Sequence, residues 1–208
     1  AVATTGYGRR LANFGDLIIT EIRACSLGVR NIECPLGQIH TVIDVGGQDT
    51  KVIALNEDGE VEDFSMNDKC AAGTGRFLEV LSHKLGLSYE DFIKAALSSK
   101  TMIQMNSTCA VFAESEVVSL LARGISSADI ACAAHHAIAE RISSMIRRVG
   151  QKEVFCFTGG GAKNRALAEA LEETLNRKVY IPHDPQTIVA LGASIAAAEK
   201  LGKGIADA

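Results

Sequence analysis

The spacing of apolar residues along the chain predicts helices separated by short strands. Apolar side chains recur at helical spacing in several segments, which is typical of a helix with one buried face. These predicted helices cover residues 16–29, 74–87, 89–96, 109–124, 127–150, 165–176 and 187–202. Shorter apolar runs predict strands at residues 1–4, 40–47 and 178–184, and at the start of 153–164. The recurring order of strand, glycine turn and helix favours an α/β fold.

The segment 50–66 breaks this order, because apolar and polar residues alternate on both sides of an Asn-Glu-Asp-Gly sequence. This pattern predicts a β-hairpin. The hairpin follows Gly46 and Gly47 directly, whereas a dinucleotide-binding unit passes from its glycine turn into a helix. A simple doubly wound fold is therefore disfavoured. For the helix over 16–29 we expect Asp16 to be the N-cap.

The composition excludes several classes of function. The chain has 208 residues, a net charge of −4 and no cluster of Lys or Arg, so we expect no nucleic-acid partner. No apolar run reaches membrane-spanning length, so we expect no membrane partner. The first ten residues do not resemble a secretory signal. We therefore expect a cytoplasmic location, where the six cysteines are reduced thiols.

The first of three glycine-rich stretches follows the strand over 40–47. Gly46 and Gly47 carry no Cβ, so their amides can approach an anion closely. Asp44 and Asp49 supply carboxylates for a hydrated Mg²⁺, which binds phosphates through few protein ligands. Gln48 lies beside the glycines, where it would orient an attacking water. We therefore assign these three polar residues catalytic roles as a hypothesis.

Two further glycine turns strengthen this interpretation. Gly73, Thr74 and Gly75 open a helix, whose N–H groups and dipole favour an anion. The second turn follows an apolar strand, where a flat ring would lie against bare backbone. It consists of Gly159, Gly160, Gly161 and Ala162. Any one of these turns alone is more simply an ordinary tight turn, but together they favour a nucleotide site. The P-loop pattern and the dinucleotide fingerprint are both absent.

Cys70 and Cys109 each precede a predicted helix, and the helix dipole favours a thiolate there. This electrostatic setting suits an iron–sulfur cluster. Two cysteines do not complete a four-thiolate shell, but a two-fold dimer would supply four. The alternative is a pair of buried free thiols. Three further cysteines lie in apolar patterns and are expected to be inert core residues, namely Cys25, Cys132 and Cys156.

The adjacent pair His135 and His136 resembles a metal-binding pair. Neighbouring residues on a helix point in different directions, however. We therefore expect exposure to solvent rather than metal binding.

Four motifs occur in order: DVGGQDTK, MNDKCAAGTGRF, STCAVFAESEV and FTGGGAKN. With them the chain resembles the BadF/BadG/BcrA/BcrD ATPase family over nearly its whole length. The resemblance implies an actin-like (ribonuclease H-like) fold of two lobes around a nucleotide. It implies that residues 1–40 belong to the first lobe and 41–208 to the second, with the helix over 187–202 packing back on the first. The family's first phosphate loop is absent here, and residues 1–4 resemble the end of a strand. We therefore expect a fragment that lacks the first strands of its N-terminal lobe.

The resemblance also implies a function. It implies an ATP-hydrolysing activator that transfers one electron to a 2-hydroxyacyl-CoA dehydratase, with reduced ferredoxin or flavodoxin as donor. The expected cofactors are ATP or ADP, Mg²⁺ and one [4Fe-4S] cluster. A homodimer would share this cluster through Cys70 and Cys109. Gly46 and Gly47 correspond to the second phosphate loop, and the turn from Gly159 to Ala162 to the adenosine side.

Three alternatives remain open from the sequence. The chain could be the ATPase component of a benzoyl-CoA reductase, which is a close relative in the same family. It could be a sugar or acetate kinase-like phosphotransferase of the same fold, which would carry no cluster. It could also be an isolated lobe that only mediates dimerisation and holds buried free thiols. The colour of the anaerobically purified protein, its iron content and its ATPase activity separate these possibilities.

Overall fold

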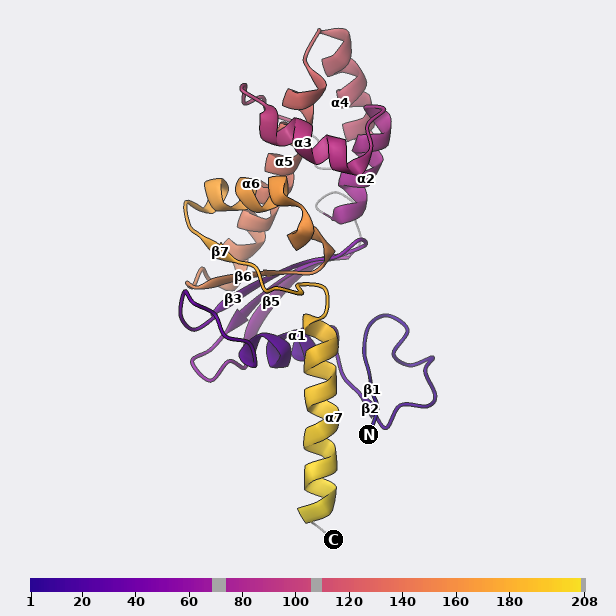
Figure 1. Cartoon of the computed structure of the whole chain (residues 1–208), viewed down its shortest axis with the longest axis vertical. Coiled ribbons are helices and arrows are strands. Elements are labelled where there is room, and N and C mark those ends of the chain that lie inside the picture. Colours follow the sequence, from indigo (N-terminus) through magenta and orange to yellow (C-terminus); the bar gives the residue numbers. More distant parts are fainter. Residues whose placement is uncertain (69–73, 106–109, 207–208) are drawn as a thin grey trace.

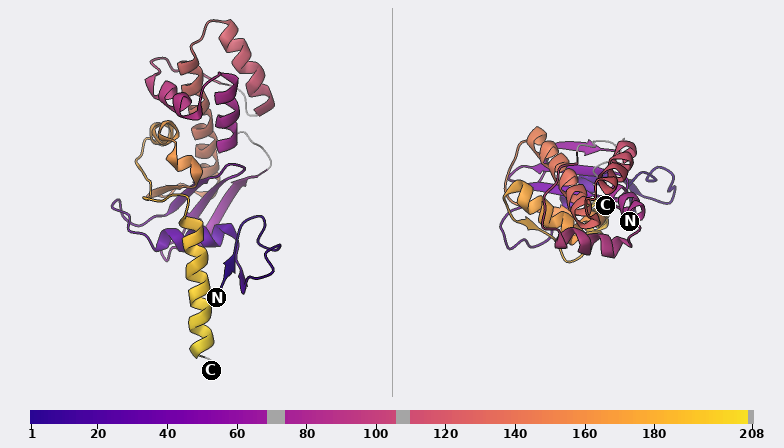
Figure 2. Two further views of the ribbon diagram at one scale, coloured as in Figure 1. Left: turned by 45° about the vertical axis from the view of Figure 1, so that its right-hand side comes forward. Right: turned by 90° about the horizontal axis from the view of Figure 1, so that it is seen from above.

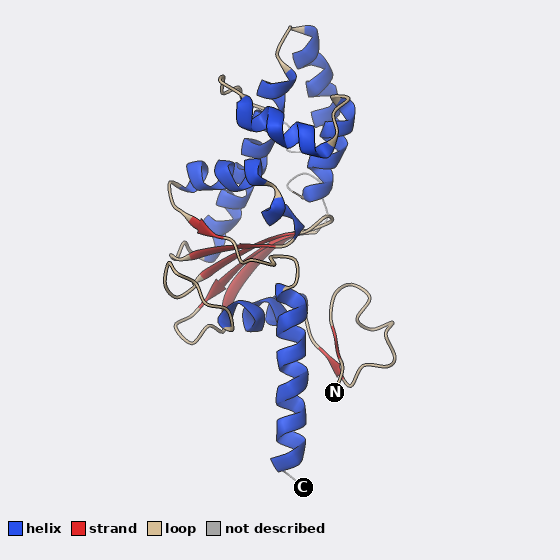
Figure 3. Ribbon diagram, viewed as in Figure 1, coloured by secondary structure: helices blue, strands red, loops and turns tan. Residues whose placement is uncertain are grey.

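A five-stranded mixed sheet forms the centre of the molecule (Figures 1 and 3). The computed structural model describes residues 1–68, 74–105 and 110–206. The strands follow the order β5-β4-β3-β6-β7 across the sheet. Their bounds are β3 Thr41–Val45, β4 Thr50–Leu55, β5 Val61–Asn67, β6 Phe155–Thr158 and β7 Val179–Tyr180. This mixed α/β architecture confirms the predicted fold class.

The predicted hairpin is present as β4 and β5, which are antiparallel to each other, and β4 is also antiparallel to β3. Its turn is held by the side chain of Asn56, whose Oδ1 accepts the N–H groups of Asp58 and Glu60 at 3.0 and 2.9 Å. Gly59 has a φ of +73°, a conformation that favours glycine. On the other side of β3, strand β6 is parallel to β3 and strand β7 is parallel to β6.

Helices cover both faces of the sheet. Successive side chains of a strand point to opposite faces, and apolar side chains of the central strand β3 point to both. On β3, Ile43 and Val45 belong to the large core, which includes residues of helices α5 (Ser127–Val149) and α6 (Arg165–Leu175). Val42 points to the opposite face, where helices α1 (Glu21–Arg30) and α7 (Ile188–Ala206) lie. We call these the α5/α6 face and the α1/α7 face.

Three further helices pack beside the upper half of α5 and form with it the upper part of the molecule in Figure 1. They are α2 (Gly75–Lys84), α3 (Tyr89–Ser98) and α4 (Ala110–Ala122). Ser88 caps α3 by accepting the N–H of Asp91, and Ser126 caps α5 by accepting the N–H of Asp129, each at 3.1 Å. Among the described residues, no helix combines the length and the apolar composition needed to cross a membrane.

Helices α1 and α7 approach each other at backbone distance. A Cβ added to Gly192 would lie 1.7 Å from the carbonyl oxygen of Ala24, and one added to Gly28 would lie 2.1 Å from that of Ile188. Only glycine permits this crossing. From there α7 extends well beyond the sheet, and Figure 2 shows it beside the N-terminal segment.

The expected cap at Asp16 is wrong. Leu17–Ile18 forms a short strand, β2, that pairs in parallel with β1 (Ala3–Thr4). Asp16 instead accepts the N–H of Val2 at 2.8 Å. Helix α1 begins four residues later than expected from that cap, and Thr20 accepts the N–H of Arg23 at its start. For Leu17 and Ile18, pairing with β1 therefore outweighs the helical spacing of apolar residues, which predicted a helix there.

Candidate functional site

Two of the predicted glycine turns lie side by side at the carboxyl ends of β3 and β6. The turn after β3 is closed by the N–H of Gly46, which donates to the carbonyl of Asp49 at 2.9 Å. Gly159, directly after β6, has a φ of +82°. A Cβ on Gly159 would lie 2.5 Å from the carbonyl oxygen of Val45 and 2.7 Å from Oδ1 of Asp44. Bare backbone therefore lines this edge of the sheet, because no side chain fits there.

The third predicted turn meets the first. The N–H of Gly75, which begins α2, donates to the carbonyl of Gly46 at 2.9 Å, and the N–H of Arg76 donates to Gly47 at 3.2 Å. These two N–H groups are therefore not free to bind an anion, in contrast to our expectation for the helix start. Instead they attach α2 to the glycine turn. Thr74, the N-cap position, is fully buried.

A charged cluster lies beneath the turns on the α1/α7 face. Asp44 on β3 and Lys51 on β4 are direct partners in the antiparallel register. Lys51 is almost fully buried, with 4% of its side chain exposed. Its Nζ lies 2.7 Å from Oδ1 of Asp49, 3.6 Å from Oδ2 of Asp44 and 3.4 Å from Oε2 of Glu21. Three carboxylates thus surround one ammonium group.

Burial and charge act in opposite directions within this cluster. Burial lowers the pKa of Lys51, but the hydrogen bond to Asp49 and the three negative charges outweigh it, so its pKa lies above the ordinary value. Burial raises the pKa of Asp44, while the ammonium of Lys51 and the hydroxyl of Thr158, 3.1 Å from Oδ1, oppose this rise. Lys51 is therefore a buried cation at neutral pH.

Asp49 presents one oxygen that accepts no hydrogen bond of ordinary geometry. Its Oδ1 accepts from Lys51, whereas Oδ2 is buried and has no such partner among the described residues. The phenol of Tyr7 lies near this carboxylate, and desolvation together with the charge of Asp49 raises the pKa of the phenol. A buried carboxylate oxygen without a partner costs free energy. A bound cation or its coordinated water would satisfy it. The cluster has two more carboxylates than ammonium groups, which also fits a divalent cation.

The other predicted site residues are distributed as follows. Gln48 is exposed at the tip of the turn after β3. Gly160, Gly161 and Ala162 form the short 3₁₀ helix η1 (Gly160–Lys163), which packs against Val45. Gly73, Cys70 and Cys109 lie outside the described residues. Within the described part of the chain, no three His, Cys, Asp or Glu side chains are grouped so as to hold a metal ion by themselves.

The remaining cysteines mostly behave as predicted. Cys25 and Cys156 are fully buried in the core on the α1/α7 face, which confirms that prediction. Cys132 is only partly buried, so the core assignment is too strong for it.

The expectation that His135 is exposed is wrong. Only 1% of His135 is accessible to solvent, because α3 and α6 pack over this part of α5. Its Nδ1 lies 2.7 Å from the carbonyl of Ala131 and therefore donates to it, while Nε2 accepts from Nδ2 of Asn164 at 3.0 Å. Burial lowers the pKa of His135 to about 4. It is a neutral structural residue. The neighbouring His136 is half-buried, and its Nε2 lies 3.3 Å from Oε2 of Glu173.

Sequence reasoning missed Lys51, Glu21 and the role of Thr158. Lys51 is part of the motif DVGGQDTK, and the glycine turn of that motif joins β3 to the antiparallel β4. Reading this turn as a second hairpin, beside the predicted one over 50–66, would have placed Lys51 beside Asp44. No local pattern marks Glu21, because it reaches the cluster only through the packing of α1 beneath the sheet.

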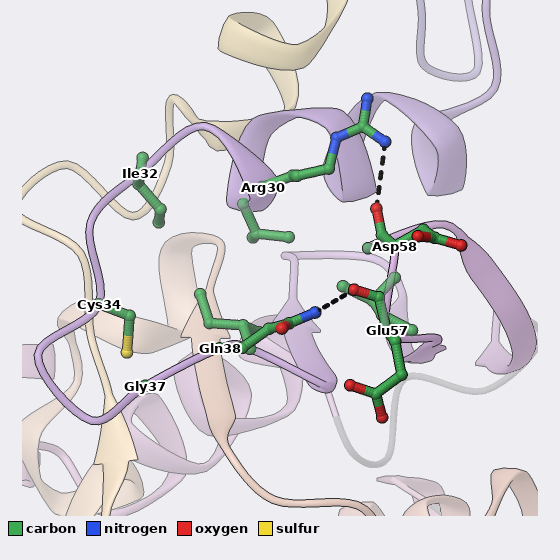
Figure 4. A pocket seen from close by; sticks show the side chains of 11 residues that line it. Arg30, Ile32, Cys34, Gly37, Gln38, Glu57 and Asp58 are labelled. Atoms are coloured by element: carbon green, nitrogen blue, oxygen red, sulfur yellow. Dashed lines mark hydrogen bonds between the residues drawn. The ribbon is translucent and has the colours of Figure 1, made fainter.

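A separate cavity of about 250 Å³ lies at the other end of the sheet, between the end of α1 and the hairpin turn (Figure 4). Arg30, Cys34, Gln38, Glu57 and Asp58 are among its lining residues. Two backbone carbonyls at its rim already accept hydrogen bonds, because Gln38 donates to that of Glu57 and Arg30 to that of Asp58. This cavity contains none of the predicted site residues. Ligands of α/β sheets usually bind at the carboxyl ends of the parallel strands, which are on the opposite side.

The fold and the paired glycine turns define the class of the protein as an actin-like ATPase. More distant solved structures, including a xylulose kinase and MreB5 of Spiroplasma citri bound to ADP, share this fold at 18% identity and TM-scores of 0.56 and 0.57. The model of the BadF/BadG/BcrA/BcrD ATPase family matches residues 1–197. The chain belongs to this family.

Two relatives show which activities occur in the family. The chain is 40% identical over 200 residues to the (R)-2-hydroxyglutaryl-CoA dehydratase activating ATPase of Acidaminococcus fermentans, covering 96% of this chain and 75% of that protein. It is 30% identical over 202 residues to a component of the benzoyl-CoA reductase of Thauera aromatica, covering 93% and 70%.

The backbone of this chain also matches a solved structure closely. It is the activator of the 2-hydroxyisocaproyl-CoA dehydratase from Clostridium difficile with bound ADPNP, with a TM-score of 0.91 and 36% identity. The match covers 100% of this chain and 76% of that one. That protein therefore binds an ATP analogue on the same backbone.

Proposed function

We propose that this chain is part of an ATP-hydrolysing activator that passes one electron to a 2-hydroxyacyl-CoA dehydratase. The observation that carries the proposal is the meeting of three glycine turns above a buried acidic cluster, on the backbone of a dehydratase activator that binds ADPNP. The turns offer bare backbone to phosphates and to the adenosine, and the cluster offers carboxylates to the metal that accompanies them.

The residues present fit a magnesium nucleotide. Asp44 and Asp49 would hold the hydrated Mg²⁺, because Oδ2 of Asp49 has no other partner among the described residues. Gly46 and Gly47 would face the phosphates, and the backbone from Gly159 to Gly161 would receive the adenosine. Gln48, exposed at the tip of the turn, would orient the attacking water. Bound Mg²⁺ would supply charge neutralisation as the terminal phosphate leaves.

Cys70 and Cys109 would hold a [4Fe-4S] cluster between two copies of the chain, and this group would supply one-electron transfer. The donor set is suitable, because Cys109 directly precedes the first residue of α4 and Cys70 lies five positions before α2. Helix N-termini favour thiolates. Helices α2 and α4 also contact each other, which supports a common location for the two cysteines.

Helix α2 would couple the two sites. Its first two N–H groups are hydrogen-bonded to Gly46 and Gly47, so a shift of the glycine turn on nucleotide binding or hydrolysis would move the start of the helix. Cys70 lies just before that start in sequence. Coupling requires that the nucleotide bind two arrangements of the molecule with different affinity. Reduced ferredoxin or flavodoxin would be the electron donor.

Anaerobic purification of the natural polypeptide that carries this sequence tests the proposal. The expected result is a brown dimer with about four iron atoms per dimer, which hydrolyses ATP. Cys70→Ser and Cys109→Ser should each lose the iron and the visible absorbance. Cys34→Ser is the matched control and should retain both, since Cys34 lies in the cavity at the other end of the sheet. Full iron content in both single variants would contradict the cluster assignment.

A benzoyl-CoA reductase partner is the second candidate, favoured by the similarity to the component of that enzyme from Thauera aromatica. Mixing the reduced activator and ATP with each purified acceptor enzyme separates the two candidates. A colourless ATP-dependent kinase would instead support the phosphotransferase considered from the sequence.

A further inference from the structure

Lys51 has no assigned role in the proposed function, although it is the cation at the centre of the acidic cluster. Its ammonium is buried and lies within 3.6 Å of three carboxylates that come from a strand, a turn and a helix. A buried lysine is rare unless it is paired. Lys51 has three carboxylate partners, and one oxygen of the nearest of them, Oδ2 of Asp49, accepts no hydrogen bond of ordinary geometry among the described residues.

The hydrogen bonds within the cluster are asymmetric. Lys51 holds Oδ1 of Asp49 at 2.7 Å, and Oδ2 of the same carboxylate is buried without a partner among the described residues. Asp44 is held on both sides, by Thr158 at Oδ1 and by Lys51 at Oδ2. One carboxylate oxygen is therefore fixed in place and left unused.

We infer that Lys51 is a positioning residue, which fixes the Asp49 carboxylate so that its Oδ2 meets the metal of a bound magnesium nucleotide. This inference deepens the proposed function and rests on it. In this inference Lys51 acts through the carboxylate of Asp49 rather than by contact with the nucleotide or the metal. Its length and its place in β4, directly opposite Asp44, allow one ammonium to orient both carboxylates at once.

Glu21, on helix α1, is the third carboxylate that contacts the ammonium of Lys51. It is the first residue of α1, and its Oε2 lies 3.4 Å from Nζ of Lys51. Glu21 thereby ties the ammonium to the helix beneath the sheet. It sits in the first turn of its helix, where a negative charge is also favoured by the dipole. Removing Glu21 together with Lys51 would leave the count of excess negative charges unchanged.

The test compares Lys51→Met, which keeps the length of the side chain, with Lys94→Met, an exposed lysine that pairs with Glu90 on α3. Both are made in the natural polypeptide. Binding of a fluorescent ADP analogue is titrated with Mg²⁺ and again in EDTA, and steady-state ATP hydrolysis is measured in parallel. For Lys51→Met we expect hydrolysis to fall about hundredfold, because a displaced catalytic carboxylate costs about this much. The increase in affinity caused by Mg²⁺ should disappear, while binding in EDTA should stay unchanged.

A double variant separates positioning from simple charge balance and also covers the case in which Lys51→Met fails to fold. Lys51→Met/Glu21→Gln removes the ammonium together with one of its carboxylates and should regain thermal stability. If Lys51 positions Asp49, the double variant remains deficient in hydrolysis and in the Mg²⁺ response. Recovery of either property would overturn the inference. Wild-type protein that shows no Mg²⁺-dependent nucleotide binding would instead overturn the proposed function itself.

Discussion

The two faces of the central sheet each contain a buried ionisable residue, and the two residues are in opposite states. On the α1/α7 face, Lys51 is surrounded by carboxylates and is charged. On the α5/α6 face, His135 is surrounded by a carbonyl, an amide and an aromatic ring, and it is neutral. Burial alone favours the neutral form in both cases. The protonation state of each residue is therefore decided by whether carboxylates surround it, as they do for Lys51 and do not for His135.

The two networks also differ in how completely they are satisfied. Asn164 donates to Tyr89 and to His135, each at 3.0 Å, and its Oδ1 accepts the N–H of Leu167 at the start of α6. No atom of that group is left without a partner among the described residues. The cluster around Lys51 leaves Oδ2 of Asp49 unused. The satisfied neutral network holds helices together, whereas the incomplete charged one is suited to a ligand.

The largest effect is expected from Asp44→Asn. Removing this charge should reduce ATP hydrolysis by about two to three orders of magnitude, comparable to the loss of one electrostatic contact to a transition state. Thermal stability should change little, because Lys51 keeps Asp49 and Glu21 as partners. Asp63→Asn on the exposed edge strand β5 is the control. Unchanged steady-state hydrolysis in Asp44→Asn would contradict the assignment of catalysis to this face.

Asn164→Ala tests the other face. It removes the cap of α6 and leaves His135 and Tyr89 without their donor, so we expect a loss of about 2–4 kcal/mol in the free energy of unfolding. Urea denaturation measures this loss. Tyr89→Phe removes one hydrogen bond only and should cost about 1 kcal/mol. Hydrolysis per folded molecule should stay near the wild-type rate in both, and a large fall in that rate would break the comparison.

Replacing two glycines of α7 by alanine is expected to change the stability of the protein in opposite directions, because only one of them lies where α7 crosses α1. Gly192→Ala should destabilise the protein by about 1–3 kcal/mol, because its Cβ would lie 1.7 Å from a carbonyl of α1. Gly202→Ala, with nothing within 4 Å, should stabilise it by about 0.5–1 kcal/mol. Melting temperatures give both signs. Equal changes at the two positions would show that α1 and α7 do not pack this closely.

A further effect depends on acid and appears only below neutral pH. In the folded chain the pKa of His135 is lowered to about 4, whereas in the unfolded chain it keeps its ordinary value near 6.5. As the pH falls, the unfolded chain therefore binds a proton at this residue at a higher pH than the folded chain does. The stability associated with this residue is complete above about pH 6.5 and is lost as the pH falls toward 4, amounting to about 1.4 kcal/mol at pH 5.5. Urea denaturation of His135→Phe and wild type at pH 7 and 5.5 isolates this loss. The same acid sensitivity in both proteins would contradict the neutral buried state.

Much of the fold could be predicted because local patterns agree with the tertiary structure. The hairpin over 50–66 and the helices over 74–87 and 127–150 follow from apolar spacing and turn residues. The start of α1 could not be predicted, because the pairing of Leu17–Ile18 with the distant β1 competes with helical spacing. The burial of His135 depends on α3 and α6, which come from other parts of the chain.

In the candidate site, too, features set by local sequence could be predicted, whereas those set by contacts between distant segments could not. The glycine turns were recognisable because only glycine permits the backbone to approach so closely, as at Gly159. Lys51 was overlooked, although its motif was recognised, because its importance arises from three carboxylates that converge from separate elements. Sequence motifs mark residues that a ligand requires directly. They do not mark residues that act by holding others in place.

The most direct test of this account is a crystal structure of the natural polypeptide with ADPNP and Mg²⁺. The account predicts phosphates at Gly46 and Gly47, the adenosine against the backbone of Gly159 to Gly161, and Mg²⁺ joined directly or through water to Asp44 and to Oδ2 of Asp49. A nucleotide bound in the cavity beside Arg30 and Cys34 at the opposite end of the sheet, or a metal that does not approach either aspartate, would contradict it.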